Sequence, residues 1–210
     1  MLGATCGNGW SAEGRQEEPS VRLFIAVDLP AGLKERLGDV QRQLAEAAAY
    51  LRFTRPEGIH LTLKFLGEVE SARLEHIIAA IQEAAAQPLE LVTSGVGVFP
   101  SPHSARVVWV GVEGDLESLQ ALQRDLNQRL QRLGFPRERG TFTPHLTVAR
   151  VRDGLGPAER AALERILAQL RPPEPVRFPV DELVLFESFL ERGGARYEGR
   201  ARARLGPGRT

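Results

Sequence analysis

Residues 58–68, GIHLTLKFLGE, alternate apolar and other side chains as a half-buried β-strand does. The positions between the apolar ones include His60 and Thr62, which are two residues apart and therefore share one face of the strand. Leu61 and Leu63 point to the opposite face, toward the expected core. A strand that could be wholly apolar thus carries an imidazole and a hydroxyl side by side.

A second copy of this pattern lies at residues 143–153, TPHLTVARVRD, where His145 and Thr147 repeat the spacing. The two histidines are 85 residues apart, because they stand at positions 60 and 145. The same offset carries the first predicted strand, residues 22–28, onto residues 107–113. Self-similarity at a fixed separation indicates a duplicated unit.

Around each copy the pattern predicts the order strand, helix, strand, helix, strand. We therefore expect an α+β fold, bilobal, with two similar sheet-plus-helix lobes related by a pseudo-twofold axis. One His-x-Thr strand from each lobe would face a central cleft. The predicted helices are residues 30–49, 71–87, 116–133 (with Asp115 as N-cap) and 157–170, and a last strand, 194–205, follows a turn at Gly193-Gly194.

The length of 210 residues suits one domain, which we place at residues 21–210. Residues 1–20 are rich in Gly, Ser and Glu, so we expect a disordered tail there. Lys plus Arg (27) equals Asp plus Glu (27), so overall charge points to neither a nucleic acid nor a membrane. The lone cysteine, Cys6, and the lack of a signal peptide or long apolar run predict a cytoplasmic protein with no membrane partner.

Two imidazoles facing each other across a cleft suit phosphoryl-ester chemistry. One takes a proton from the attacking oxygen while the other gives a proton to the leaving oxygen. Histidine serves both roles because it titrates near neutral pH. The hydroxyls of Thr62 and Thr147 can donate hydrogen bonds to the non-bridging oxygens, where charge gathers.

Other catalytic arrangements lack the residues they need. A zinc site needs three or four ligands, and only His76 and His103 remain, without an HExxH motif or a cysteine pair. We therefore predict no metal and no cofactor. His76 is expected in solvent, whereas His103 lies either at the surface or at the border of the cleft. A serine triad lacks the GxSxG signature.

The segments HLTLKFLGEV and PHLTVAR resemble the two H-x-T-x signatures of the 2H phosphoesterase superfamily. The flanking stretches RLFIAVDLP, GVFPSPHSARVVWVGV and LVLFESFLERGGARYE are similar to its bacterial and archaeal RNA 2′,3′-cyclic phosphodiesterases, often labelled 2′-5′ RNA ligases. The resemblance covers about residues 21–204. It implies metal-independent hydrolysis of RNA 2′,3′-cyclic phosphate ends to 2′-phosphates, with reversible 2′-5′ ligation as a second reaction.

Residue by residue, the resemblance implies two catalytic histidines, His60 and His145, with His60 as general acid and His145 as general base. It also implies that Thr62, Thr147 and Arg150 bind substrate. Because Arg150 follows the second signature, we expect it to disfavour the charged form of His145, giving that histidine the lower pKa of the two.

The roles of three further side chains stay open. Arg150 has the parity of Leu146 in an ideal strand, so a β-bulge or the strand end must turn it to the cleft. Lys64 shares the parity of His60 and is a second candidate phosphate contact, or else a solvated edge charge. Phe142 either stacks on a base or packs in the core.

The expected partners are RNA with a 2′,3′-cyclic phosphate end, tRNA-derived ends included, or cyclic nucleotides, bound by a monomer. Two alternatives keep the cleft but change its use. One is an enzyme acting on a cyclic phosphate of an ADP-ribose-type nucleotide. The other is a non-catalytic RNA-binding module, which would not need two proton-transfer groups.

Overall fold

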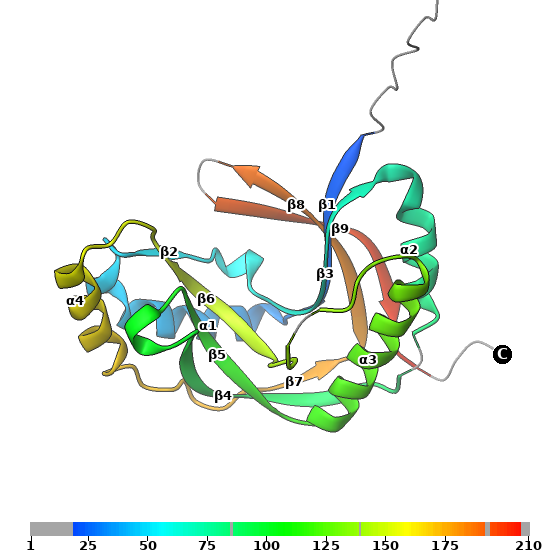
Figure 1. The fold of residues 1–210 in the computed structure, drawn as a ribbon. Helices are drawn as coiled ribbons and strands as arrows, with labels where there is room; N and C mark the ends of the chain where they lie inside the picture. Colours follow the sequence, from blue (N-terminus) through cyan, green and yellow to red (C-terminus); the bar gives the residue numbers. More distant parts are fainter. Residues whose placement is uncertain (1–18, 85, 139, 192–193, 207–210) are drawn as a thin grey trace, which may run out of the picture.

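The computed structural model describes residues 19–84, 86–138, 140–191 and 194–206. Over these residues the chain forms one curled antiparallel sheet flanked by helices (Figure 1). The strands are β1 (Ser20–Asp28), β2 (Leu51–Phe53), β3 (His60–Glu70), β4 (Leu89–Phe99), β5 (Val107–Gly114), β6 (His145–Val151), β7 (Arg177–Val180), β8 (Glu182–Glu191) and β9 (Gly194–Arg204). The helices are α1 (Ala31–Gln43), α2 (Leu74–Gln82), α3 (Leu116–Arg132) and α4 (Pro157–Leu167).

The two His-x-Thr strands, β3 and β6, lie side by side at the centre of the sheet, where Leu61 pairs with Leu146. Outward from this pair the order is β6, β5, β4, β7 on one side and β3, β1, β8, β9 on the other. The last strand of each predicted copy is therefore exchanged, because β4 pairs with β5 and β8 pairs with β1. The predicted α+β class is confirmed, and the pseudo-twofold axis stays a prediction.

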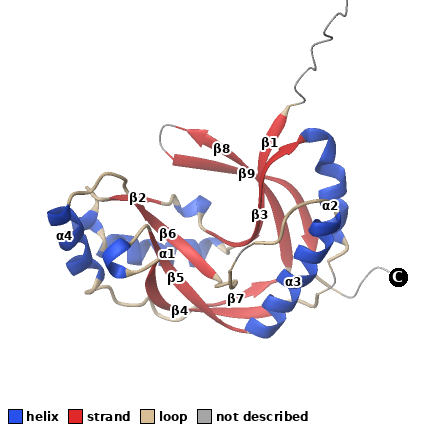
Figure 2. Ribbon diagram, in the orientation of Figure 1, coloured by secondary structure: helices blue, strands red, loops and turns tan. Residues whose placement is uncertain are grey.

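The helices flank the curled sheet at its two ends (Figure 2). Helix α1 packs on β6 and α3 on β3, so each central strand is supported by a helix from the other copy. Most buried side chains form one continuous apolar cluster, which includes Leu61, Leu63 and Leu146, each at most 1% exposed. None of the described helices is both long and apolar enough to cross a membrane.

Several predicted boundaries were wrong. The helices predicted at 30–49, 71–87 and 157–170 are shorter than expected, and 3₁₀ turns occupy Ala45–Ala47 and Ser71–Arg73. The short strands β2 and β7 were not predicted. Each is extended because it pairs with one neighbouring strand, β2 with β6 and β7 with β4, and this pairing cannot be read from local sequence. The expected tail, residues 1–20, lies outside the described ranges except for its last two residues. Gly193 of the predicted turn also lies outside them.

Two finer details differ from the prediction. Asp115 is the N-cap residue of α3, as predicted, but its carboxylate makes no hydrogen bond to the helix and instead accepts from the Glu90 N–H at 2.9 Å. In register, Ala26 lies opposite Thr62 and Trp109 lies opposite Thr147. The equivalent residues of the two first strands are therefore 83 residues apart. The predicted offset of 85 residues, which placed 22–28 on 107–113, was two residues too long.

Candidate active site

The five predicted site residues line one cavity of about 600 Å³ that both His-x-Thr strands share. The antiparallel register that pairs Leu61 with Leu146 sets His60 opposite Thr147 and Thr62 opposite His145. The two His-x-Thr pairs thus run antiparallel to each other along one face of the sheet. The cavity is lined by Arg22, Leu23, Phe24, Thr54, Gly58, His60, Thr62, Phe65, Gly67, Val107, His145, Thr147, Arg150, Ser188, Leu190, Ala195 and Tyr197.

A β-bulge in β3 changes which side chains reach the cavity. Ala26 lies opposite Thr62, but the next residue of β1, Ile25, lies opposite Lys64, so one residue of β3 is unpaired. Beyond it the parity is reversed. Lys64 is 1% exposed and points to the core, whereas Phe65 lines the cavity and is 59% exposed. Lys64 is therefore neither a phosphate contact nor a solvated edge charge.

The same bulge recurs in β6. Trp109 lies opposite Thr147, but Val108 lies opposite Ala149. The reversed parity brings Arg150 into the cavity, as its predicted role requires. Phe65 and Arg150 are 85 residues apart and so occupy equivalent positions of the two copies. One copy presents an aromatic ring there and the other a guanidinium.

His60 is surrounded by aromatic rings from three strands. Its ring centroid lies 4.6 Å from that of Phe24, 5.9 Å from Phe186 and 5.1 Å from Tyr197, whose ring is edge-on. Burial among these rings lowers the pKa of His60 from 6.5 to about 4. A hydrogen bond to the backbone of Gly58 opposes this shift. In the free protein His60 is therefore neutral at pH 7.

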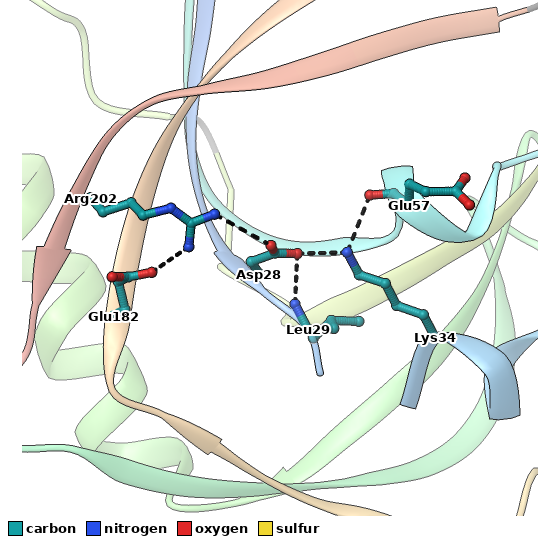
Figure 3. A network of polar contacts seen from close by, with 6 residues as sticks. All are labelled: Asp28, Leu29, Lys34, Glu57, Glu182 and Arg202. Atoms are coloured by element: carbon teal, nitrogen blue, oxygen red, sulfur yellow. Dashed lines mark hydrogen bonds and ion pairs between the residues drawn. The ribbon is translucent and has the colours of Figure 1, made fainter. Parts of the chain in front are cut away.

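The carboxylate of Asp28 lies beside His60 in the β1–β3 register and also raises the pKa of His60, against the larger effect of burial. Lys34 limits this effect, since its ammonium donates to Asp28 at 2.7 Å and to the Glu57 carbonyl at 3.2 Å (Figure 3). Arg202 lies 3.9 Å from the other carboxylate oxygen. The charge of Asp28 is thus shared with two cations and leaves His60 uncharged.

His145 has a different environment. Its Nδ1 lies 2.7 Å from the carbonyl oxygen of Thr143, so Nδ1–H is the donor. In the neutral ring Nε2 then carries the lone pair and can accept a proton. Its ring lies 5.0 Å from that of Phe99, edge-on, and 6.4 Å from that of Trp109.

The charge of Arg150 acts on the pKa of the histidine of the other strand, which the sequence did not predict. In the antiparallel β3–β6 pair, residues that follow Thr147 run past the chain that precedes His60. The charge of Arg150 accordingly contributes to the lowered pKa of His60. The sequence argument failed because it assumed that Arg150 acts on the histidine of its own strand.

The other candidate residues lie away from the cavity. His76 is exposed on α2, as expected. His103 is exposed and lies 2.8 Å from Glu164, so it belongs to the surface. Phe142 packs against the core. Within the described ranges, no three His, Cys, Asp or Glu side chains are grouped so that they could hold a metal ion.

Sequence reasoning missed the aromatic residues that surround His60. Phe24 and Phe186 belong to a second, smaller apolar cluster on the cavity side of the sheet, against which Tyr197 packs. Both phenylalanines lie in continuous apolar runs, where alternation gives no sign of which face is the cavity. Tyr197 has no distinguishing pattern, because its position depends on the β8–β9 pairing.

The lowered pKa of His60 predicts a pH-dependent stability. Between about pH 4 and 6.5 the unfolded chain binds a proton at this position that the folded chain excludes, so stability rises with pH. The contribution is complete above pH 6.5 and is lost as the pH falls to about 4, by about 3 kcal/mol at most. Urea unfolding at intervals from pH 4 to 7 measures it. His60→Gln should flatten the profile in this window, and an unchanged slope would contradict the buried neutral imidazole.

The chain matches known proteins over most of its length. A profile of the 2′-5′ RNA ligase superfamily matches residues 29–188. A protein of Methanothermobacter thermautotrophicus named RNA 2′,3′-cyclic phosphodiesterase is 38% identical over 84% of this chain and 95% of its own length. One of the same name from Archaeoglobus fulgidus is 39% identical over 63% of this chain and 73% of its own length.

Solved structures agree in fold. Escherichia coli LigT complexed with 3′-AMP has a TM-score of 0.73 at 26% identity, covering 89% of this chain and 99% of that one. Thermus thermophilus TT0787 has a TM-score of 0.70 at 27% identity, covering 88% and 97%. Together with the paired His-x-Thr strands at one cavity, these matches show that the chain belongs to the 2′-5′ RNA ligase superfamily, a group of 2H phosphoesterases.

Proposed function

We propose that this protein hydrolyses RNA 2′,3′-cyclic phosphate ends to 2′-phosphates. The observation that carries the proposal is the convergence of both His-x-Thr pairs and Arg150 on one cavity. The names of the relatives, RNA 2′,3′-cyclic phosphodiesterase, support the same reaction. We further propose that the enzyme acts as a monomer in the cytoplasm.

Two imidazoles are enough for the proton transfers of this reaction. One takes a proton from water as its oxygen bonds to phosphorus. The other gives a proton to the 3′ oxygen as the bond between phosphorus and that oxygen breaks, which leaves a 2′-phosphate and a free 3′ hydroxyl. Thr62, Thr147 and Arg150 supply hydrogen bonds and positive charge to the non-bridging oxygens. With a 5′ hydroxyl in place of water, the same displacement of the 3′ oxygen forms a 2′-5′ linkage.

The walls of the cavity suit a nucleoside beside the phosphate. On the side of His60 they include Phe65 and Tyr197, and Phe65 is exposed enough to meet a base. Aromatic faces stack on any base and so accept RNA ends without strong sequence preference. We therefore propose a general RNA 3′ end as substrate, with 2′,3′-cyclic mononucleotides as smaller ones.

The proposal is tested by incubating the protein in EDTA with a 2′,3′-cyclic mononucleotide, a cyclic-phosphate-ended oligonucleotide and an ADP-ribose cyclic phosphate. We expect the first two to give 2′-phosphates at undiminished rates, because the histidines need no metal. Activity that vanishes with chelator and returns with a divalent ion would contradict the mechanism. If only the ADP-ribose compound is turned over, the substrate is a cyclic phosphate of that nucleotide and not an RNA end. Binding without turnover would make the protein a non-catalytic RNA-binding module.

A further inference from the structure

The connection between α3 and β6 is fastened to β3 by two charged side chains. The buried ammonium of Lys64 donates to the Pro136 carbonyl at 2.6 Å. The carboxylate of Glu138 accepts from the backbone N–H of Phe65 at 2.9 Å. The two charges also interact. Burial lowers the pKa of Lys64, and the negative charge of Glu138 opposes this shift. We refer to Lys64 and Glu138 as the latch.

The latch supplies a hydrogen-bond partner that the sheet does not provide to β3. Among the described residues, β3 and β6 pair directly only through Leu61 and Leu146. Beyond this pair no strand of the described ranges lies on that edge of β3, and the N–H of Phe65 has no ladder partner there. Glu138 satisfies this N–H immediately after the bulge that turns the Phe65 ring into the cavity.

The ring that the latch holds is part of the cavity wall. Phe65 lies 6.0 Å from Phe24, whose ring is 4.6 Å from His60. The opposite end of the same connection leads to Thr143, whose carbonyl orients His145. Neither latch residue lines the cavity, so any influence on substrate passes through these neighbours.

We propose that Lys64 and Glu138 are positioning residues, which hold the Phe65 ring at the cavity wall and so determine how well a nucleotide is bound. The proposal rests on the proposed function, since it assumes that a nucleoside lies against Phe65. A latch with a purely structural role would alter stability without distinguishing substrates that carry a base from those that do not.

Kinetics of latch variants test the idea. Glu138→Ala should raise KM for a 2′,3′-cyclic mononucleotide about tenfold, the effect of one hydrogen bond to a charged group, with little change in kcat. Glu138→Gln should stay near wild type, because its amide oxygen still accepts. Lys64→Met should act in the same direction as Glu138→Ala. KM for ribose 2′,3′-cyclic phosphate, which has neither a nucleobase nor any other aromatic ring, should not change. Glu75→Ala, at an exposed glutamate of α2, is the matched control.

A double variant separates positioning from general damage. In a Phe65→Ala background, Glu138→Ala should have almost no further effect on KM, because both changes remove the same ring contact. Additive effects, an equal loss on the substrate without a base, or a Glu138→Gln variant as impaired as Glu138→Ala would each overturn the proposal.

Hydrogen exchange gives a readout that does not depend on activity. The Phe65 amide should be protected in wild type and exchange faster in Glu138→Ala, and the Glu75→Ala control should leave it unchanged. If the wild type hydrolyses no cyclic phosphate but the amide behaves as expected, the proposed function fails while the fastening of Phe65 stands. If the Phe65 amide exchanges equally in all three proteins, the latch itself is refuted.

Discussion

His145→Ala and His60→Ala are each expected to lower the turnover of a 2′,3′-cyclic mononucleotide by about 10²–10⁴-fold, the usual cost of losing a general acid or base. Both imidazoles line the cavity, and each lies opposite a threonine of the other copy. Because neither side chain belongs to the main apolar core, both variants should fold. The comparison of kcat and KM with circular dichroism spectra checks this expectation.

The threonines supply a graded control. Thr62→Ala and Thr147→Ala each remove one hydrogen bond to a charged oxygen, so each should cost about 1.5–3 kcal/mol of transition-state stabilisation. The expected order of activities is wild type, then the threonine variants, then the histidine variants. A histidine variant with nearly full activity would refute the paired-imidazole mechanism.

A substrate with an activated leaving group should distinguish the two histidines. An aryl phosphodiester such as bis(4-nitrophenyl) phosphate needs no proton on its departing oxygen. We expect His60→Ala to be largely rescued on this substrate and His145→Ala not to be, because we propose His60 as the general acid and His145 as the general base. Rescue of His145→Ala alone would exchange the roles while leaving the reaction unchanged.

The low pKa of His60 adds a condition to this assignment. An acid must carry a proton, yet burial keeps His60 neutral at pH 7 in the free protein. The phosphate anion of the substrate would lie beside the ring and favour its charged form, by about 1–3 pKa units for a close opposite charge. Binding of a 2′-phosphate product should therefore take up a proton. Calorimetry in buffers of different ionisation enthalpy measures the uptake, which His60→Ala should abolish.

Much of the site could be predicted because its catalytic and binding side chains stand two residues apart in the sequence. His60 and Thr62 share a face by the two-residue period of a strand, and the repeat at His145 and Thr147 makes coincidence a poor explanation. The structure places all four at one cavity. Their catalytic roles remain proposals, since placement alone does not show turnover.

Other properties depended on which strands pair. A period of two assumes an unbroken strand, but the bulges after Thr62 and Thr147 are set by the pairing with β1 and β5. The bulge in β3 sent Lys64 to the core and Phe65 to the cavity. The bulge in β6 turned Arg150 into the cavity. From the sequence it was clear only that Arg150 needs such a bulge, or the strand end, to reach the cavity.

The sequence by itself determined the α+β class, the two repeated strands and the residues that could exchange protons, because these follow from local periodicity and from the chemistry of single side chains. Only the tertiary structure decided that His60 is buried and neutral. Phe186 lies on β8 and Tyr197 on β9, more than a hundred residues from His60, and Arg150 reaches His60 through antiparallel pairing. A pKa depends on burial and on nearby charge, and both are properties of neighbours in space.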